Sequence, residues 1–209
     1  MCSLSQLICL NNALLRRYAT RFSIAKIKKI MIYLNFLFYL TLLLPKIVLL
    51  VSLQKLEISL LCRYNNIFVL FFILKKHTQT LLNMLVDLTL IDLPQKKLRF
   101  KIIYIARTMK FNMIMKIKAS LLELVAIPSV SVLYLAASWF ERESWDMFGV
   151  FFMNHSRLKR LLTDYGFTGY PLRKDFPFCG FYEVRFSEIL QRLSYEPVTL
   201  ASAPKLNEI

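Results

Sequence analysis

Apolar residues follow two different spacings between residues 55 and 76. Over Lys55–Arg63 they alternate with polar residues, with Leu61 as the exception, which predicts a half-buried strand. Over Ile67–Lys76 they recur at spacings of three and four, which predicts a helix that Asn65-Asn66 caps. Because its second face is also apolar, we expect this helix to be buried on both sides. The inward positions expected on these two elements are Leu56, Ile58, Leu60, Cys62, Ile67, Leu70, Phe71 and Leu74.

Three further apolar stretches predict three more strands. They are Asn83–Leu93, Leu98–Ile105 and Phe111–Lys118, and the last two form a hairpin that turns about Arg107–Lys110. Phe111, Met113, Met115 and Ile117 share one face of the third strand. The expected fold is α+β: one small mixed sheet with helices on one face, a C-terminal charged helix pair and an extended irregular tail.

An apolar stretch near the start raises the question of a membrane span. Met31–Leu53 has 23 residues and a single charge, Lys46, which is long enough to cross a bilayer. Pro45-Lys46 interrupts it, however, and Asn35 and Thr41 dilute its first part. We therefore expect a buried amphipathic helix over Ile32–Leu44 that leads into a strand, and no direct membrane span.

The charged helix pair is expected over 139–148 and 155–165. Ser138 followed by Glu141 matches a capping box, and Gly149 is a suitable stop because glycine adopts the left-handed conformation at low cost. Within the first helix, Arg142 should face Asp146 four residues later. The second helix starts near Asn154.

The whole chain divides into three parts on this pattern. Residues 1–52 form a basic and apolar N-terminal extension with a helix, and residues 53–167 form the α+β domain. Residues 168–209 contain several prolines and too few periodic apolar positions for a core of their own. We expect this tail to lie extended along a partner subunit.

Charge is spread unevenly along the chain. Residues 1–122 carry 19 Lys and Arg against 3 Asp and Glu, a net charge of +16, whereas residues 123–209 carry 9 against 10. Such a field attracts anionic surfaces such as lipid headgroups, RNA or acidic proteins. The simpler explanation is an A/T-rich genome, since Phe, Ile, Leu, Lys, Asn and Tyr are abundant and glycine falls to four residues.

Cysteine and histidine supply no metal-binding pattern. Cys2, Cys9, Cys62 and Cys179 form no CxxC motif, and the two histidines lie far apart in sequence. We therefore expect no zinc or iron–sulfur site in this chain, and free thiols suit a reducing compartment.

A signature runs from the charged helices into the tail. It consists of ERE at 141–143, DMF at 146–148, His155, Lys159, LTDYGF at 162–167 and PLRKDFP at 171–177. Its order and spacing resemble the 30-kDa subunit of respiratory complex I, the proton-pumping NADH:ubiquinone oxidoreductase. The resemblance is strong over 127–185 and weaker back to residue 53.

The resemblance implies a non-catalytic structural and assembly subunit of the hydrophilic arm. It implies no catalytic, cofactor-binding or metal-binding residue here, with FMN, iron–sulfur clusters, NADH and ubiquinone bound by neighbouring subunits. The partner implied is the large quinone-site subunit, of the 49-kDa type, together with other hydrophilic-arm subunits. The location implied is the matrix side of the mitochondrial inner membrane.

Two groups of signature residues have expected roles. Ionic contacts within the subunit and across its interface are expected of Glu141, Arg142, Glu143, Asp146, Arg173, Lys174 and Asp175. The expected apolar anchors are Trp139, Trp145, Tyr165 and Phe176. His155 should cap or pair near a helix start, and Lys159, Asp164, Gly166 and Pro177 complete the signature.

Other interpretations remain open from the residues alone. Residues 1–30 contain six Lys and Arg and no acid, as in a mitochondrial presequence. With the A/T-rich bias, this favours synthesis inside the mitochondrion or an import signal that is not cut. The charge also suits a basic mitochondrial ribosomal protein that binds RNA, and Met31–Leu53 suits a small integral membrane protein. Membrane-bound hydrogenases share the same subunit type.

Overall fold

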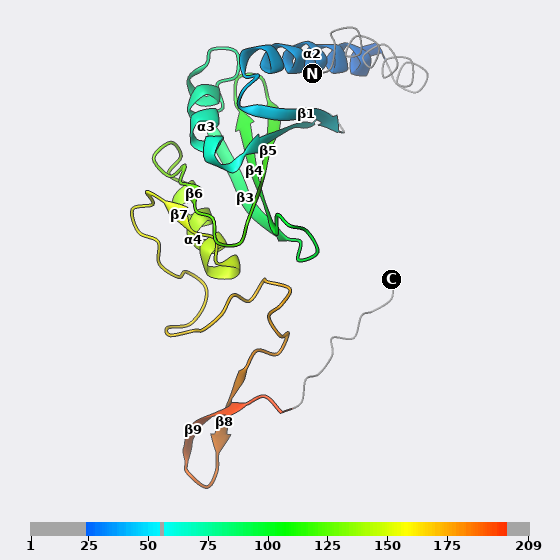
Figure 1. Cartoon of the computed structure of the whole chain (residues 1–209). Helices are drawn as coiled ribbons and strands as arrows, with labels where there is room; N and C mark the ends of the chain where they lie inside the picture. Colours follow the sequence, from blue (N-terminus) through cyan, green and yellow to red (C-terminus); the bar gives the residue numbers. More distant parts are fainter. Residues whose placement is uncertain (1–23, 55–56, 200–209) are drawn as a thin grey trace. The chain divides into compact units, whose positions relative to one another are not determined.

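The computed structural model describes residues 24–54 and 57–199, and Figure 1 traces their course. These residues form two units, one of residues 24–87 and 103–119, the other of residues 88–102 and 120–199. In chain order the elements are α2 (Ile24–Leu43), β1 (Val48–Gln54), β2 (Glu57–Arg63), η1 (Tyr64–Asn66), α3 (Ile67–Lys76), β3 (Met84–Asp92), β4 (Phe100–Thr108), β5 (Met113–Leu121), β6 (Ile127–Pro128), α4 (Ala137–Phe148), β7 (Phe152–Met153), β8 (Tyr182–Ser187) and β9 (Arg192–Pro197).

The architecture is mixed α+β, as the pattern predicted. A five-stranded sheet has the order β1-β2-β5-β4-β3, and two smaller sheets pair β6 with β7 and β8 with β9. The core contains the predicted inward positions of β2 and α3, and Phe71 packs edge-on against Tyr104 with ring centroids 5.1 Å apart. Leu56, most of the basic segment 1–30 and residues 200–209 of the tail lie outside the described residues.

The predicted helix Ile67–Lys76 is confirmed as α3, with two differences. Its start follows the 3-10 turn η1, and the Asn66 side chain makes no capping hydrogen bond. Within the described part of the chain its second face is exposed at Val69 and Phe72. The prediction of burial on both sides is therefore wrong for the chain alone.

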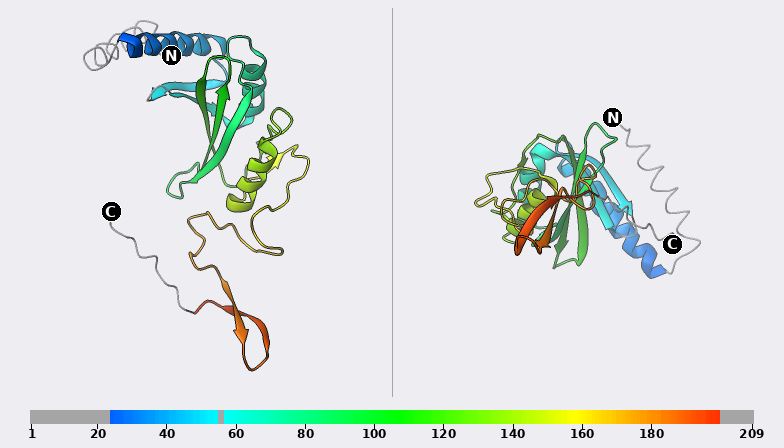
Figure 2. Two further views of the ribbon diagram at one scale, coloured as in Figure 1. Left: turned by 180° about the vertical axis from the view of Figure 1, so that it is seen from behind. Right: turned by 90° about the horizontal axis from the view of Figure 1, so that it is seen from below.

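Helix α2 is longer than predicted and ends just before Pro45. It lies alongside β1, as the two views of Figure 2 show. Across residues 24–54 and 57–199, no helix combines the length and hydropathy that crossing a membrane requires.

Strand β1 lies where the sequence predicted only the connection from the helix into the strand over Lys55–Arg63. It pairs antiparallel with β2, with a register shift between Val48 and Leu50. Its sequence VLLVSLQ lacks clear alternation, and this hid it within a long apolar stretch.

Strands β3, β4 and β5 confirm the three predicted strands with shifted ends. Met113, Met115 and Ile117 are buried on one face, but Phe111 is exposed. The chain is still turning there, and Asn112 has a φ of 50°.

The predicted helix over 155–165 is absent, and the tail is more regular than expected. Residues 155–165 form turns and bends without a helical ladder, and several of their backbone groups pair with side chains of α4. In the tail, β8 and β9 pair in register from Tyr182↔Pro197 to Ser187↔Arg192, which makes a hairpin instead of an irregular segment.

Candidate functional site

Helix α4 carries the first part of the signature and ends as the sequence predicted. Gly149 takes a φ of 75°, and its N–H donates to the Trp145 carbonyl at 2.8 Å. A side chain here would be strained, and its Cβ would lie 2.6 Å from both Arg173 Nη2 and the Tyr170 ring. The glycine therefore ends the helix and lets the tail approach it.

The buried face of α4 is polar, which reverses the usual arrangement. Its buried residues are Ala137, Glu141, Ser144 and Asp146, whereas Trp139 is 60% exposed. The predicted capping box is wrong, since the helix begins before Ser138 and makes no side-chain cap. Glu141 is instead buried and contacts the loop at Ser129 and Val130.

Glu141 accepts two hydrogen bonds inside the fold. Its carboxylate accepts one hydrogen bond from the Ser129 hydroxyl at 2.5 Å and one from the Val130 N–H at 2.8 Å. Burial raises the pKa of Glu141 to about 7, although these two hydrogen bonds act in the opposite direction. We call Glu141, Ser129, Val130 and His155 the Glu141 pocket.

His155 closes this pocket as a neutral ring. Its Nδ1 accepts the Arg157 N–H at 3.1 Å, so the proton is on Nε2, which donates to the Ser138 carbonyl at 3.2 Å. Nε2 lies 3.9 Å from the Glu141 carboxylate, and neither side chain is exposed. His155 therefore pairs with α4, but no helix starts here.

Asp146 occupies a nest of donors from the segment after His155. The N–H groups of Leu161, Leu162 and Thr163 donate to one carboxylate oxygen at 3.1, 2.8 and 3.0 Å. The Thr163 hydroxyl and Arg160 donate to the other at 2.6 and 2.9 Å. Burial alone would raise the pKa of Asp146, but the hydrogen bonds, that of the Thr163 hydroxyl foremost, outweigh it and lower the pKa below its usual range. We call these five residues the Asp146 nest.

Arg160 connects the nest to the tail, and the sequence did not single it out. Besides Asp146, it donates to the Gly169 carbonyl at 3.1 and 3.2 Å. Its guanidinium also stacks over aromatic rings, 5.6 Å from the Trp145 centroid and 5.4 Å from that of Tyr170. Trp145 is thus a platform for Arg160.

Arg142 does not face Asp146 as predicted. It donates to the carbonyls of Lys159 and Arg160 at 3.0 and 3.2 Å, and its guanidinium lies 5.2 Å from the Trp139 ring. These carbonyls need donors because the segment is not helical. Arg142 therefore satisfies backbone acceptors where ion pairing was expected.

A third group, which we call the Arg99 clamp, consists of Arg99, Asp92, Glu123, Arg173 and Asp175. Arg99 donates two hydrogen bonds to the Asp92 carboxylate, at 2.8 and 3.0 Å. It also forms ion pairs with Glu123 and Asp175. The hydrogen bond from Arg99 lowers the pKa of Asp92 below its usual range, against the effect of burial.

The PLRKDFP segment enters this clamp. Arg173 donates to Glu123 and to the Phe148 carbonyl, both at 2.6 Å, and covers the Tyr170 ring at 4.4 Å. The Lys174 N–H donates to Asp92 at 2.9 Å. The tail up to residue 176 is therefore fastened within its own unit.

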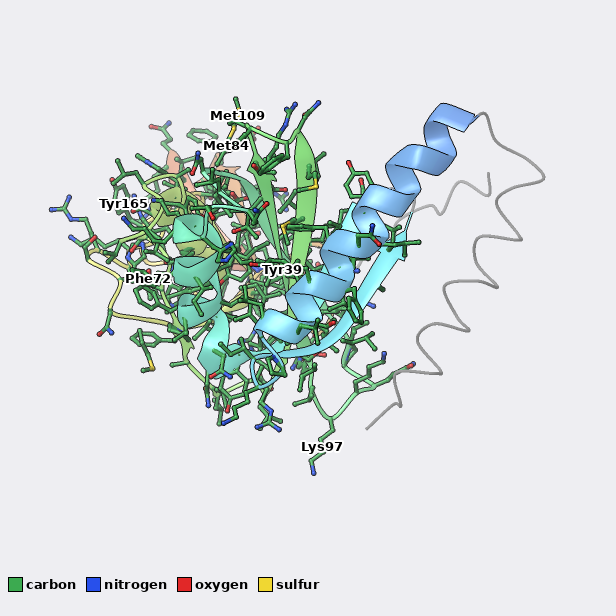
Figure 3. All side chains as sticks on the ribbon, turned by 90° about the horizontal axis from the view of Figure 1, so that it is seen from above. Tyr39, Phe72, Met84, Lys97, Met109 and Tyr165 are labelled. Carbon is green, nitrogen blue, oxygen red and sulfur yellow. The ribbon has the colours of Figure 1, made fainter. Side chains whose placement is uncertain are left out.

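The other signature residues lie at or near the surface. Glu143, Lys159, Asp164, Tyr165, Gly166 and Pro177 are exposed. Asp164 accepts the Tyr165 N–H at 2.7 Å, and Gly166 takes a φ of 74°, so this stretch is a turn. The Tyr165 side chain is left fully outward, as Figure 3 shows.

The residues that the sequence missed are Asp92, Arg99, Glu123 and Arg160. Asp92, Arg99 and Glu123 lie at or near strand ends, whereas Arg160 lies in a segment without a helix or strand, and the partners of these residues lie up to 82 positions away in the chain. No short motif records such a pairing. Among residues 24–54 and 57–199, no three His, Cys, Asp or Glu side chains gather as a metal-ion site.

Comparisons with known proteins agree with the signature. Residues 61–182 match the family described as the respiratory-chain NADH dehydrogenase 30-kDa subunit, and the signature at 141–177 lies inside this range. NADH-ubiquinone oxidoreductase subunit 9 of Reclinomonas americana is 44% identical over 147 residues, which cover 70% of this chain and 72% of the relative.

A plant relative and a solved structure extend this picture. NADH dehydrogenase [ubiquinone] iron-sulfur protein 3 of Arabidopsis thaliana is 44% identical over 136 residues, 65% of this chain and 72% of the relative. A chain in the structure of the membrane-bound sulfane sulfur reductase, an archaeal respiratory membrane complex, matches with a TM-score of 0.58 and 20% identity. The match covers 66% of this chain and 83% of that one, and it shows a shared fold.

Proposed function

The chain belongs to the family of the respiratory-chain NADH dehydrogenase 30-kDa subunit, and we propose that its role there is structural and non-catalytic. As a member it is a subunit of NADH-quinone oxidoreductase and serves respiratory electron transfer. This membership leaves the ribosomal and integral-membrane alternatives without support.

The structural role is supported by one observation: the buried charged residues of the signature bind other segments of the same unit. The Glu141 pocket, the Asp146 nest and the Arg99 clamp each join α4 or a sheet end to a distant segment of the same unit. The carboxyl groups of Glu141 and Asp146 are fully buried and already hydrogen-bonded. This suits a scaffold whose ionic groups set the path of the chain.

The tail hairpin supports contact with a partner subunit. The register of β8 with β9 places six residues on one face, all of them aromatic, aliphatic or proline: Tyr182, Val184, Phe186, Leu193, Tyr195 and Pro197. The first five of these side chains are exposed. An isolated two-stranded hairpin is marginally stable in water, so a neighbour has to cover this face. The large quinone-site subunit of the 49-kDa type is that neighbour, with residues 168–209 along it.

The cofactors of the reaction belong to neighbouring subunits in this proposal. FMN, the iron–sulfur clusters, NADH and ubiquinone are bound elsewhere, and this chain holds the hydrophilic arm together on the matrix side of the mitochondrial inner membrane. The absence of a cofactor site in this chain remains a prediction. Loading the purified chain with iron and sulfide and recording its absorption spectrum tests it.

Native-gel separation of mitochondrial membranes, with mass spectrometry across the lanes, tests the whole proposal. We expect the chain to migrate with the NADH-dehydrogenase activity band. A variant that lacks residues 182–197 should leave that band while the other hydrophilic-arm subunits accumulate as a smaller assembly. Full assembly of this variant with slow turnover would contradict the structural role.

A further inference from the structure

Among the residues that the structure describes, helix α2 has one buried apolar stripe and one exposed apolar stripe. The buried stripe consists of Tyr33, Leu37 and Leu40, and the buried Leu44 follows directly after the helix. The second stripe consists of Phe38, Tyr39, Leu42 and Leu43, which recur at spacings of one, three and four and are exposed. A soluble helix that is apolar on both sides is normally covered on both sides.

Strand β1 extends this apolar area. It is the last strand at its end of the five-stranded sheet, and it has neither a charged residue nor a proline to protect that edge. Leu49 and Leu50 are exposed beside α2, which packs against β1. We call Phe38, Tyr39, Leu42, Leu43, Leu49 and Leu50 the α2–β1 surface.

One side chain of this surface is held in place. The Tyr39 hydroxyl lies 2.9 Å from His77 Nε2, and the two rings are 5.7 Å apart. His77 follows the last residue of α3, so this contact links α2 to the end of α3. A ring that is fixed and part-exposed is suited to be an anchor at an interface.

The segment that carries this surface contains charged residues of a single sign. Residues 24–54 contain Lys26, Lys28, Lys29 and Lys46 and no acidic residue. Resting on the proposed function, we propose that the α2–β1 surface docks into an apolar groove, rimmed by Asp and Glu side chains, on another subunit of the same complex. This is the helix-in-groove mode of recognition, with lysines that select an acidic rim. The surface lies outside residues 61–182, which match the family.

The same features argue against a lipid surface and against a second copy of the chain. A helix that lies in a membrane interface has a strongly charged polar face, whereas α2 has no charged residue after Lys29. Two copies would bring together two surfaces of the same positive charge, which is unfavourable at short range. A protein groove with an acidic rim would cover the apolar side chains and would also attract the lysines.

Zero-length carbodiimide cross-linking of the intact complex, followed by mass spectrometry, tests the proposal. This reagent joins a lysine only to a carboxylate in contact with it. We expect cross-links from at least one of the four lysines to acidic residues of one other subunit. Links confined to this chain, links between two copies, or labelling of α2 by a photoactivatable lipid would overturn the proposal.

Leu42→Glu and Met109→Glu provide a matched pair for the same question. Leu42 is 63% exposed on α2, and Met109 is 64% exposed at the β4–β5 turn of the same unit, well away from Tyr39 in Figure 3. Leu42→Glu should lower the yield of cross-links to the other subunit at least tenfold and leave the melting temperature of the full chain unchanged. Met109→Glu should change neither.

The outcomes also separate this proposal from the proposed function. If the unaltered chain does not migrate with the NADH-dehydrogenase band, the proposed function fails. If it migrates there but Leu42→Glu retains the unaltered cross-links, only the docking of the α2–β1 surface fails.

Discussion

Helix α4 buries two carboxyl groups, and their surroundings move the two pKa values in opposite directions. Glu141 has two hydrogen-bond donors and no cation bound to it, and its pKa rises to about 7. Asp146 has five donors, one of them Arg160, and its pKa falls below the usual range. Burial raises both pKa values, but only at Asp146 do the hydrogen bonds, that of the Thr163 hydroxyl foremost, outweigh it.

The two groups should therefore contribute to stability at opposite ends of the pH scale. The raised pKa of Glu141 contributes stability that is complete below its ordinary value of 4.5 and is lost as the pH rises through about 7. The lowered pKa of Asp146 contributes stability above its ordinary value of 3.8, and this is lost as the pH falls further. Four substitutions sharpen this contrast.

Asp146→Asn should have the largest effect. The amide keeps one acceptor but directs an NH₂ group at donors that need an oxygen, and Arg160 loses its anion. We expect the free energy of unfolding to fall by about 3–5 kcal/mol, as for other broken buried pairs. Urea unfolding of the purified chain at pH 7 measures this. Asp164→Asn, the same change at an exposed turn, should cost far less, and equal losses would contradict the nest.

Glu141→Gln should change the pH dependence of stability more than stability itself. The amide mimics the protonated carboxyl and never becomes charged. We expect little change at pH 4.5 and a gain over the unaltered chain of about 3 kcal/mol at pH 8. Urea unfolding across this pH range measures it. The exposed Glu143→Gln should leave the pH profile as it is, and an unchanged profile for Glu141→Gln would show that Glu141 is solvated.

Arg160→Met should have a smaller effect than Asp146→Asn. The methionine retains the contact with Trp145, and Asp146 keeps four donors from the backbone and Thr163. Loss of the hydrogen bonds from Arg160 to Asp146 and to the Gly169 carbonyl predicts a decrease of about 2–3 kcal/mol in the free energy of unfolding. The double variant with Asp146→Asn should cost less than the sum of the two, which a double-mutant cycle measures. Strict additivity would show that the two residues act independently.

His155→Gln should have the smallest effect. Glutamine can still donate to the Ser138 carbonyl, and the ring beside Glu141 is neutral. We expect a decrease of about 1 kcal/mol or less, with complex assembly and NADH–quinone turnover unchanged on a native activity gel. An assembled but inactive complex would mean that His155 takes part in the reaction.

Local patterns predicted the regular elements well. Helix α3 was predicted to the residue, the strands β2 to β5 were found with shifted ends, and Gly149 ends α4 as expected. Each depends on the periodicity of a few neighbouring side chains or on the conformational freedom of one glycine, and these are properties of a short segment.

Predictions that required a choice among partners were less successful. The pairing of Arg142 with Asp146, the Ser138 capping box and the helix over 155–165 are all plausible locally, and all three are wrong. In each case a segment more than ten residues away offered a better partner. Ser129 and Val130 donate hydrogen bonds to Glu141, and the backbone N–H groups of Leu161–Thr163 donate to Asp146.

The sequence by itself determined the fold class, the signature and the family, because periodicity and motif spacing are recorded in residue order. Only the tertiary structure decided which charged residues form ion pairs and hydrogen bonds with each other. Asp92 and Lys174 lie 82 positions apart and Glu123 and Arg173 lie 50 apart, yet both pairs are in contact. Burial makes an unpaired charge costly, so the packed chain selects the partner that is close in space, and residue order does not record that distance.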